Sequence, residues 1–443
     1  MYKPCITLIF CTLFSTEYAH ADDINMLNQK ANIAAEQEFF EEAIALYTEC
    51  YSMNFHDVQS MFSAAICLLK IGRITESITL LNSICSLVKN PLPIRYNIAY
   101  AYKTAGMIDT AIALYRDIIA QNPEYEDAHL GLGFAYLQNG DFVNGWHQHS
   151  RYLKKAGKNS DELRALLHNN DLVNKKILLA YEGGLGDTLL FIRYVERIKN
   201  LGAQTICLVQ KPLIPLLSRC PYIDRLLPYQ HPVPEHDARA TLMSLPAIFE
   251  DTEDRFTVSI PYLYPDQALV NTWKERLAQY DTIKIGITWQ SDVHNDVSRL
   301  PIARRGIPLA LFEPLLKDER FTFFSLQCFE GTEQIAHLSP DCRLVTYADL
   351  DTKHGCFMDT AAIIQNLDLV IAVDSAVANI SGALGIPTIL LLPYVTDWRW
   401  IANRKDSPWY PEHIIFKQPQ PFDWESTVHE VGTYLESLFF KKG

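Results

Sequence analysis

Polar side chains follow three apolar runs in the second half of the chain, and their types suit phosphate binding and acid–base chemistry. The first is Asp187, which comes after the run Ile177–Tyr181 and the glycines Gly183, Gly184 and Gly186. Glycines permit a tight turn from a strand into a helix, with the backbone close to a ligand. Asp187 either faces a ligand cleft or serves as an N-cap, a role that Asp fills well.

A basic loop follows the second apolar run, Ile285–Trp289. Its charged and polar residues include His294, Asp296, Arg299, Arg304 and Arg305. Because arginine is a forked donor, such a cluster after a strand suits a diphosphate. The alternative is a solvated loop whose arginines pair with the protein's own carboxylates.

The third apolar run, Leu369–Val373, ends in Asp374, Ser375 and Ala376. A helix that begins there presents free backbone N–H groups and the positive end of its dipole to an anion. The alternative is an ordinary strand-to-helix turn in which Ser or Asp is the N-cap of the helix. The three segments together indicate a ligand site better than any one of them.

The elements that must position these residues are those of an α/β fold. Short apolar runs alternate with longer amphipathic stretches, which predicts βαβ units and parallel sheets. The predicted strands are Ile177–Tyr181, Thr205–Val209, Lys284–Trp289, Phe321–Leu326, Leu369–Val373 and Thr388–Leu392. They divide between a lobe at 172–275 and a lobe at 281–443, with a Pro-rich irregular stretch from Tyr229 to Gln267 and a closing helix from Trp424. Ligands of such folds bind at the carboxyl ends of the strands.

A repeat of 34 residues precedes these lobes. Small residues recur at this spacing, in one series at Ala31, Ala65, Ala99 and Gly133 and in another at Ala43, Ser77, Ala111 and Gly145. A third series contains Gly72, Gly106 and Gly140. Small residues let paired helices approach closely, and a glycine can end the first helix of each pair. The spacing therefore predicts an α-solenoid over residues 24–157.

Composition excludes several classes of protein. The chain has 443 residues, 48% of them hydrophobic, and a net charge of −13. Such an acidic chain is a poor candidate for binding nucleic acid or an anionic membrane surface, and no apolar run approaches the ~20 residues of a membrane span. The ten cysteines contain no CxxC pair, which argues against a zinc site and favours reduced thiols.

Residues 1–21 are either a secretory signal peptide or a misassigned start. Lys3, an apolar run and Ala19-His20-Ala21 occur in the order of a signal peptide, but organised sequence begins near Met26. We expect a cytoplasmic protein, and the signal-like segment leaves export as the alternative.

The motifs resemble a known family. The 34-residue units resemble the tetratricopeptide repeat. The later segments resemble the tetratricopeptide-linked branch of the heptosyltransferase-like glycosyltransferases, and they read GGLGDTLLFIRY, DTAAIIQNLDLVIAVDSAVA, GALGIP and DWRW…DSPWYP. The resemblance implies a tetratricopeptide solenoid followed by a two-lobed, Rossmann-like GT-B fold. It also implies inverting transfer of a sugar from a nucleotide-sugar donor, without a metal or another cofactor.

The resemblance also assigns roles to individual residues. Asp187 matches the proposed catalytic base, and Arg305 matches the basic residue that meets the donor phosphates. Asn379 stands where the family usually has His. The expected donor-binding residues are Gly184, Gly186, Trp289, Arg305, Asp374, Ser375, Ala376 and Asn379.

Two functions follow as hypotheses. The favoured one is a glycosyltransferase whose first lobe, 172–275, faces the acceptor and whose second lobe, 281–443, binds the nucleotide sugar. Its acceptor is a protein or a glycan, presented with help from the tetratricopeptide groove. The alternative is a tetratricopeptide interaction module with an inactive transferase-like domain, a reading that Asn379 and the signal-like N-terminus motivate.

Overall fold

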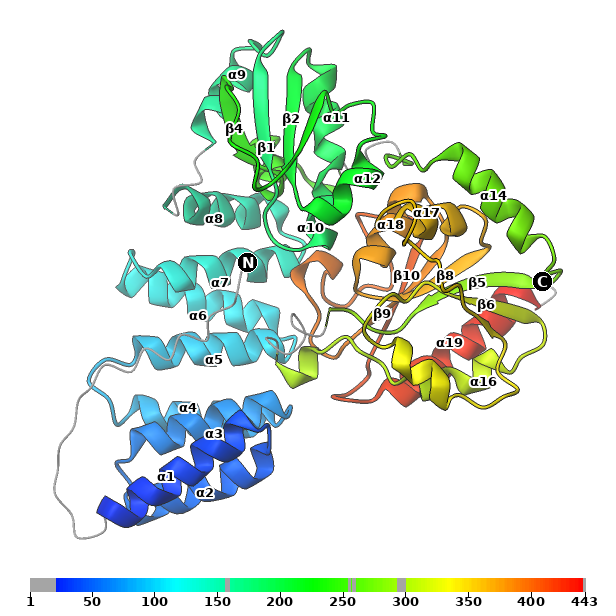
Figure 1. Cartoon of the computed structure of the whole chain (residues 1–443). Coiled ribbons are helices and arrows are strands. Elements are labelled where there is room, and N and C mark those ends of the chain that lie inside the picture. The colour runs from blue at the N-terminus through cyan, green and yellow to red at the C-terminus, as the bar shows by residue number, and fades with distance from the viewer. Residues whose placement is uncertain (1–20, 156–159, 254–255, 257–259, 293–299, 441–443) are drawn as a thin grey trace. The chain divides into compact units, whose positions relative to one another are not determined.

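The structure is a computed structural model that describes residues 21–155, 160–253, 256, 260–292 and 300–440 (Figure 1). The chain forms two compact units. One extends to Asn139 and also takes in Leu300–Ile302, and the other contains the remaining residues from Gly140 onward. The predicted boundaries 24–157, 172–275 and 281–443 remain predictions. The segment 1–20, and His294, Asp296 and Arg299 of the basic loop, lie outside the described residues.

The first unit is built from antiparallel helices. They are α1 (Ala21–Glu36), α2 (Phe40–Met53), α3 (Val58–Lys70), α4 (Ile74–Cys85), α5 (Leu92–Thr104), α6 (Ile108–Gln121) and α7 (Glu126–Gln138). The small residues of the 34-residue series are buried where these helices meet. Ala31, Ala65 and Ala99, and equally Ala43 and Ala111, are 0% exposed. The predicted close approach of paired helices is thus confirmed.

Residues in the left-handed backbone conformation, with positive φ, end the first helix of each repeat. Gly72, Gly106 and Gly140 have φ of 84°, 77° and 79°, and Glu38 takes the same conformation with φ of 65°. Glycine adopts this conformation without steric cost, which explains its recurrence at a spacing of 34 residues. The helix pairs predicted from the spacing are therefore present.

The second unit begins with two helices and a four-stranded parallel sheet. The helices are α8 (Phe142–Lys155) and α9 (Asp161–His168). The strands are β1 (Lys176–Ala180), β2 (Gln204–Val209), β3 (Arg225–Pro228) and β4 (Ala238–Thr241), in the order β3-β2-β1-β4. Around them lie α10 (Leu185–Phe191), α11 (Arg193–Asn200), η1 (Lys211–Leu213), α12 (Ile214–Leu217), η2 (Leu242–Ser244), α13 (Leu245–Ile248) and α14 (Gln267–Leu277).

A six-stranded parallel sheet forms the second lobe. Its order is β10-β9-β8-β5-β6-β7, so β5 and β8 are central. The strands are β5 (Ile283–Thr288), β6 (Phe321–Ser325), β7 (Leu344–Val345), β8 (Leu369–Val373), β9 (Thr388–Leu392) and β10 (His413–Lys417). The helices are η4 (Pro301–Ala303), η5 (Leu309–Phe312), α16 (Glu313–Leu316), η6 (Thr332–His337), α17 (Met358–Ile364), α18 (Ala376–Leu384), η7 (Trp398–Trp400) and α19 (Trp424–Phe439). All six predicted strands and the closing helix are present, with ends displaced by at most one residue, and the predicted fold class is confirmed.

The sequence analysis was wrong about part of the stretch from Tyr229 to Gln267. This stretch is not irregular throughout, because it contains β4, which pairs with β1 from Ala238 to Thr241. The strand reads Ala-Arg-Ala-Thr, and its alanines and its shortness give it little strand propensity or apolar periodicity. The short strands β3, β7 and β10 were missed as well.

No helix within the described ranges is both long and apolar enough to cross a membrane. The eight cysteines that the structure describes all have free thiols, and four of them are buried.

Candidate functional site

The loop between β1 and α10 holds Asp187 in one orientation. The backbone N–H of Gly184, the N-cap residue of α10, donates to Asp187 Oδ2 at 2.7 Å. Asp187 is therefore the third residue of the helix and not its N-cap, although its side chain does help to cap the helix by accepting the N–H of Gly184. Gln210, just after β2, holds the same loop, because its Nε2 donates to the carbonyl oxygen of Gly184 at 3.0 Å.

Gly183 is required by this arrangement. It has φ of 83°, and a Cβ atom there would lie 2.1 Å from Asp187 Oδ2. Any side chain at 183 would thus collide with the carboxylate as well as strain the backbone. Gly184 is more tolerant, since a Cβ atom there would meet Asp187 Oδ2 at an ordinary 3.7 Å.

The second lobe supplies a cation to Asp187. Arg399 of η7 donates through Nη2 to Asp187 Oδ1 and through Nη1 to Asp397 Oδ1, the latter at 2.6 Å. The side chains of Asp187 and Arg399 are each only 16% exposed. Burial raises the pKa of the Asp187 carboxyl, and the nearby charge of Arg399 opposes this rise. Burial is the larger of these effects, so the pKa of Asp187 is raised above its ordinary value, and a raised carboxylate pKa favours a role as general base.

The turn between β8 and α18 is shaped for an anion. Ser375 is the N-cap of α18, but its side chain makes no capping hydrogen bond. Its Oγ is buried without a hydrogen-bond partner. Because the N–H groups of the first turn, which starts at Ala376, have no acceptor within the helix, they are available to a ligand together with this hydroxyl. An ordinary Ser cap, the alternative considered from the sequence, would have used that hydroxyl.

Arg305 lies against the same turn. Its Nη1 donates to the backbone carbonyl oxygen of Asp374 at 2.8 Å and lies 3.7 Å from Asp374 Oδ2. Both side chains are largely buried, at 11% and 13% exposure. The arginine thus pairs with one of the protein's own carboxylates, as the alternative foresaw, but it does so at the anion-shaped turn and not on a solvated loop.

Asn379 joins this turn to the first lobe. Its Nδ2 donates to the carbonyl oxygen of Ser375 at 2.9 Å, and its Oδ1 accepts a hydrogen bond from the Tyr410 hydroxyl at 2.9 Å. A Cβ atom on Gly186 would lie 3.0 Å from Asn379 Nδ2, so the glycine lets the two lobes meet closely. Seven of the nine predicted site residues, Asp187 included, therefore gather where α10 and α18 begin, and Arg305 joins them through Asp374.

Trp289 is the exception. It is 0% exposed, belongs to the core of the second lobe, and donates through Nε1 to the carbonyl oxygen of Gly331 at 3.1 Å. Its side chain has no surface open to a donor. The residue follows β5 directly, and sequence alone does not show to which side such a residue turns.

Sequence reasoning missed Arg193 as part of this region. It is fully buried and donates to the Tyr262 hydroxyl and to the carbonyl oxygen of Trp409, both at 2.9 Å. The Tyr262 and Tyr410 hydroxyl groups lie 3.1 Å apart, which continues the network to Asn379. A charged residue within the apolar stretch Leu189–Val195 was the available signal, because buried charges must be paired.

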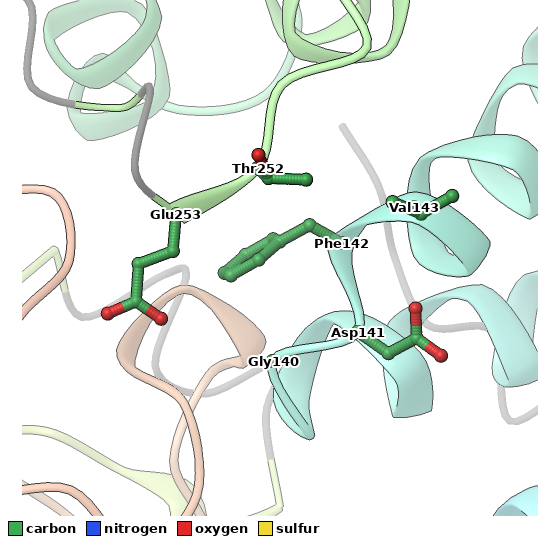
Figure 2. Close-up of a pocket in the computed structure, with 6 residues that line it drawn as sticks. All are labelled: Gly140, Asp141, Phe142, Val143, Thr252 and Glu253. Carbon is green, nitrogen blue, oxygen red and sulfur yellow. The ribbon is translucent and has the colours of Figure 1, made fainter.

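Two cavities lie elsewhere in the second unit. The larger, of about 560 Å³, is lined by Gly140, Asp141, Phe142, Val143, Thr252 and Glu253 (Figure 2). In Figure 2 the Phe142 ring lies toward the Glu253 side, while the Asp141 and Val143 side chains extend from the other side of the chain. The smaller, of about 340 Å³, is lined by residues of β9, β10, η7 and their neighbours, among them Trp400, Arg404 and Lys417. Neither includes Asp187 or the 374–376 turn.

Within the described ranges, no three His, Cys, Asp or Glu side chains are placed to hold a metal ion.

Comparison with family models finds one match within the repeat region. Residues 103–143 match the tetratricopeptide repeat family. The match agrees with the 34-residue spacing and with the helix pairs of the first unit.

Other similarities cover more of the chain. Protein FlbA of Caulobacter vibrioides is 25% identical over 95% of this chain and 74% of its own length. Among solved structures, the chain is similar to a glycosyl transferase family 9 protein from Veillonella parvula, with 13% identity, a TM-score of 0.40, and coverage of 60% of this chain and 90% of that one. It is also similar to the E. coli ADP-heptose lps heptosyltransferase II, with 12% identity, a TM-score of 0.41, and coverage of 59% and 99%.

Proposed function

We propose that this protein is an inverting glycosyltransferase that moves a sugar from a nucleotide-sugar donor to an acceptor hydroxyl group. One observation carries the proposal. A buried, oriented carboxylate of the first lobe, Asp187, lies at the junction with the anion-shaped turn of the second lobe. An inverting transfer needs both parts. One is a general base that deprotonates the acceptor hydroxyl, and the other is a site that stabilises the negative charge of the leaving group.

The proposed reaction uses these residues as follows. The acceptor oxygen attacks the anomeric carbon while Asp187 takes the hydroxyl proton, and a bond forms between that oxygen and the carbon. On the opposite face, the bond from the anomeric carbon to the phosphate oxygen breaks, and the electron pair leaves with the nucleoside diphosphate. Ser375, the first N–H groups of α18 and Arg305 offset the charge that develops there.

This arrangement supports transfer without a metal ion, because arginine, backbone N–H groups and a helix dipole can neutralise a leaving diphosphate. We also propose that the tetratricopeptide repeats help to present a protein or glycan acceptor, since solenoids of this kind form extended concave binding surfaces.

A nucleotide-binding test separates this proposal from its alternative. The purified protein is screened by thermal shift against nucleoside diphosphates and nucleotide sugars. A ligand at 100 times its dissociation constant stabilises a fold by about 2.7 kcal/mol, which moves the unfolding midpoint by a few degrees. A selective shift would support a working donor site. Failure of every donor to shift a folded protein would favour the inactive interaction module.

Asp187→Asn tests the catalytic base. The amide keeps the size of the side chain but cannot take the acceptor proton, so we expect sugar transfer to fall by about 10²–10⁴-fold while nucleotide affinity stays within twofold. Radiolabelled transfer and calorimetric titration measure the two quantities. Asp341→Asn is the matched control, since this exposed carboxylate pairs with Lys317 and leaves the base and its partners in place. Normal transfer by Asp187→Asn would exclude Asp187 as the base.

A further inference from the structure

Arg399 occupies a place that the transfer reaction alone does not explain. Its two terminal nitrogens contact carboxylates of both lobes, Asp187 of α10 and Asp397 just before η7. Its guanidinium carbon lies 4.5 Å from the centre of the Trp398 ring. A third carboxylate, Asp374, acts on Arg399 from the anion-shaped turn. The side chain is therefore set between the proposed base and the proposed leaving-group site.

The surroundings of Arg399 leave it little freedom to move. Its backbone N–H donates to Asp397 Oδ1 at 3.1 Å, and its carbonyl oxygen accepts from Trp409 Nε1 at 2.8 Å. The neighbouring Trp398 is 7% exposed and packs on Trp146 and Phe191, with ring centroids 5.6 Å and 6.4 Å away. The Arg399 backbone is held by these hydrogen bonds and its guanidinium group by the two carboxylates, so the group is preorganised toward Asp187.

The charges around Asp187 explain why such a cation is needed. Burial favours the neutral acid, and Asp397 and Asp374 favour it too because they are negative. Against them act the Gly184 N–H, which bonds Oδ2, and Arg399, which bonds Oδ1. Arg305 is directed at Asp374 and not at Asp187. A protonated carboxyl group cannot remove a proton from an acceptor.

From this geometry we infer that Arg399 is a positioning residue that keeps Asp187 ionised and oriented, so that the second lobe completes the base carried by the first. The inference rests on the proposed function, because it assumes that Asp187 is the base. It adds a requirement that the reaction scheme does not contain, namely that the base depends on a side chain 212 residues away. Carboxylates beside an arginine commonly have their pKa lowered by 1–3 units.

The test measures the titration of Asp187 directly and through the reaction. In the full chain labelled with ¹³C at aspartate carboxyl carbons, the Asp187 resonance is the one that Asp187→Asn removes. We expect Arg399→Gln to raise the midpoint of that titration by about 1–3 pH units and to move the acid limb of kcat/KM by the same amount. Arg399→Lys retains the charge but not the fork, so the limb should return toward that of the natural chain while kcat stays reduced.

Arg404→Gln is the matched control. Arg404 follows η7 in the same segment but pairs with Asp406 and Glu253, whereas Arg399 pairs with Asp187. It should leave the Asp187 titration unchanged. An unchanged Asp187 midpoint in a folded Arg399→Gln variant would overturn the inference, and Arg399→Met, which also removes the charge, serves the same measurement if the glutamine variant does not fold. A raised midpoint in a protein that transfers no sugar from any donor would support the role of Arg399 and reject the proposed function.

Discussion

At the scale of single residues, the site depends on atoms that are absent as much as on atoms that are present. The missing side chain of Gly183 leaves the space that Asp187 Oδ2 occupies, and the missing side chain of Gly186 lets Asn379 approach. The glycines of this loop are thus not equivalent. Two of them make room for a particular polar group, whereas Gly184 contributes its N–H.

Gly183→Ala should damage the site far more than Gly184→Ala. An alanine at 183 meets a backbone φ of 83° and a carboxylate oxygen 2.1 Å from its Cβ, so Asp187 must move. We expect a destabilisation of about 1–3 kcal/mol and a loss of transfer approaching that of Asp187→Asn. Chemical denaturation and initial transfer rates measure these effects. Gly184→Ala is the control, and equal losses in the two variants would contradict this account.

At the scale of elements, helix α18 is held by one hydrogen-bonded chain of side chains. Arg193 of α11 bonds Tyr262, whose hydroxyl lies beside that of Tyr410, and Tyr410 bonds Asn379 one turn into α18. Gly382 lets the helix lie against Tyr410, because a Cβ atom there would be 2.4 Å from the Tyr410 ring. The position and the amide orientation of Asn379 are therefore set from outside the helix.

Tyr410→Phe tests this chain by removing one oxygen atom. Asn379 Oδ1 then loses its donor inside the protein, which should cost about 1–3 kcal/mol of unfolding free energy. Because Asn379 also bonds the carbonyl oxygen of Ser375, we expect affinity for a nucleoside diphosphate to fall about fivefold to tenfold by calorimetry. Tyr434→Phe, in α19, is the control. Unchanged affinity in the destabilised Tyr410→Phe variant would mean that the chain supports the fold alone.

The same elements show what can be read from a sequence. The strand Leu369–Val373 and the 34-residue helix pairs were predicted closely, because continuous apolar runs and recurring small residues are local signals. The partner of Asp187 was not predicted. Arg399 lies 212 residues from Asp187 in the sequence, and no local pattern links the two positions. The burial of the Trp289 side chain was not foreseen either, because it depends on the packing of the completed sheet.

At the scale of the whole molecule, the second unit contains a buried histidine that makes it sensitive to acid. His413 is 1% exposed, and neither of its ring nitrogens has a hydrogen-bond partner. Burial, reinforced by the charge of Arg193, lowers the pKa of His413 to about 3. In the unfolded chain the same group titrates near pH 6.5, so between these values the unfolded state binds the extra proton. Above about pH 6.5 the histidine is neutral in both states and costs no stability. As the pH falls from there toward 3, proton uptake by the unfolded chain progressively lowers the free energy of unfolding.

His413→Leu should remove part of this acid sensitivity. The free energy of unfolding of the natural chain should fall between pH 7.5 and pH 5, and that of the variant should fall less, because no proton is taken up at position 413. Denaturant unfolding at the two pH values gives the comparison. His429→Gln, an exposed substitution in α19, is the control and should behave like the natural chain. An equal fall in the free energy of unfolding in all three proteins would show that His413 does not cause the loss of stability in acid.

The strand order of the six-stranded sheet also has a consequence for synthesis. β5 is the first of its strands to leave the ribosome, yet it lies inside the sheet, and its neighbour β8 begins at Leu369, more than eighty residues after β5 begins at Ile283. At least one edge of the strand Ile283–Thr288 therefore has no partner strand while the intervening chain is synthesised. Non-local parallel pairing of this kind folds slowly and exposes the nascent chain to aggregation. We expect the yield of this protein to depend on translation speed and chaperone supply more than its final stability suggests.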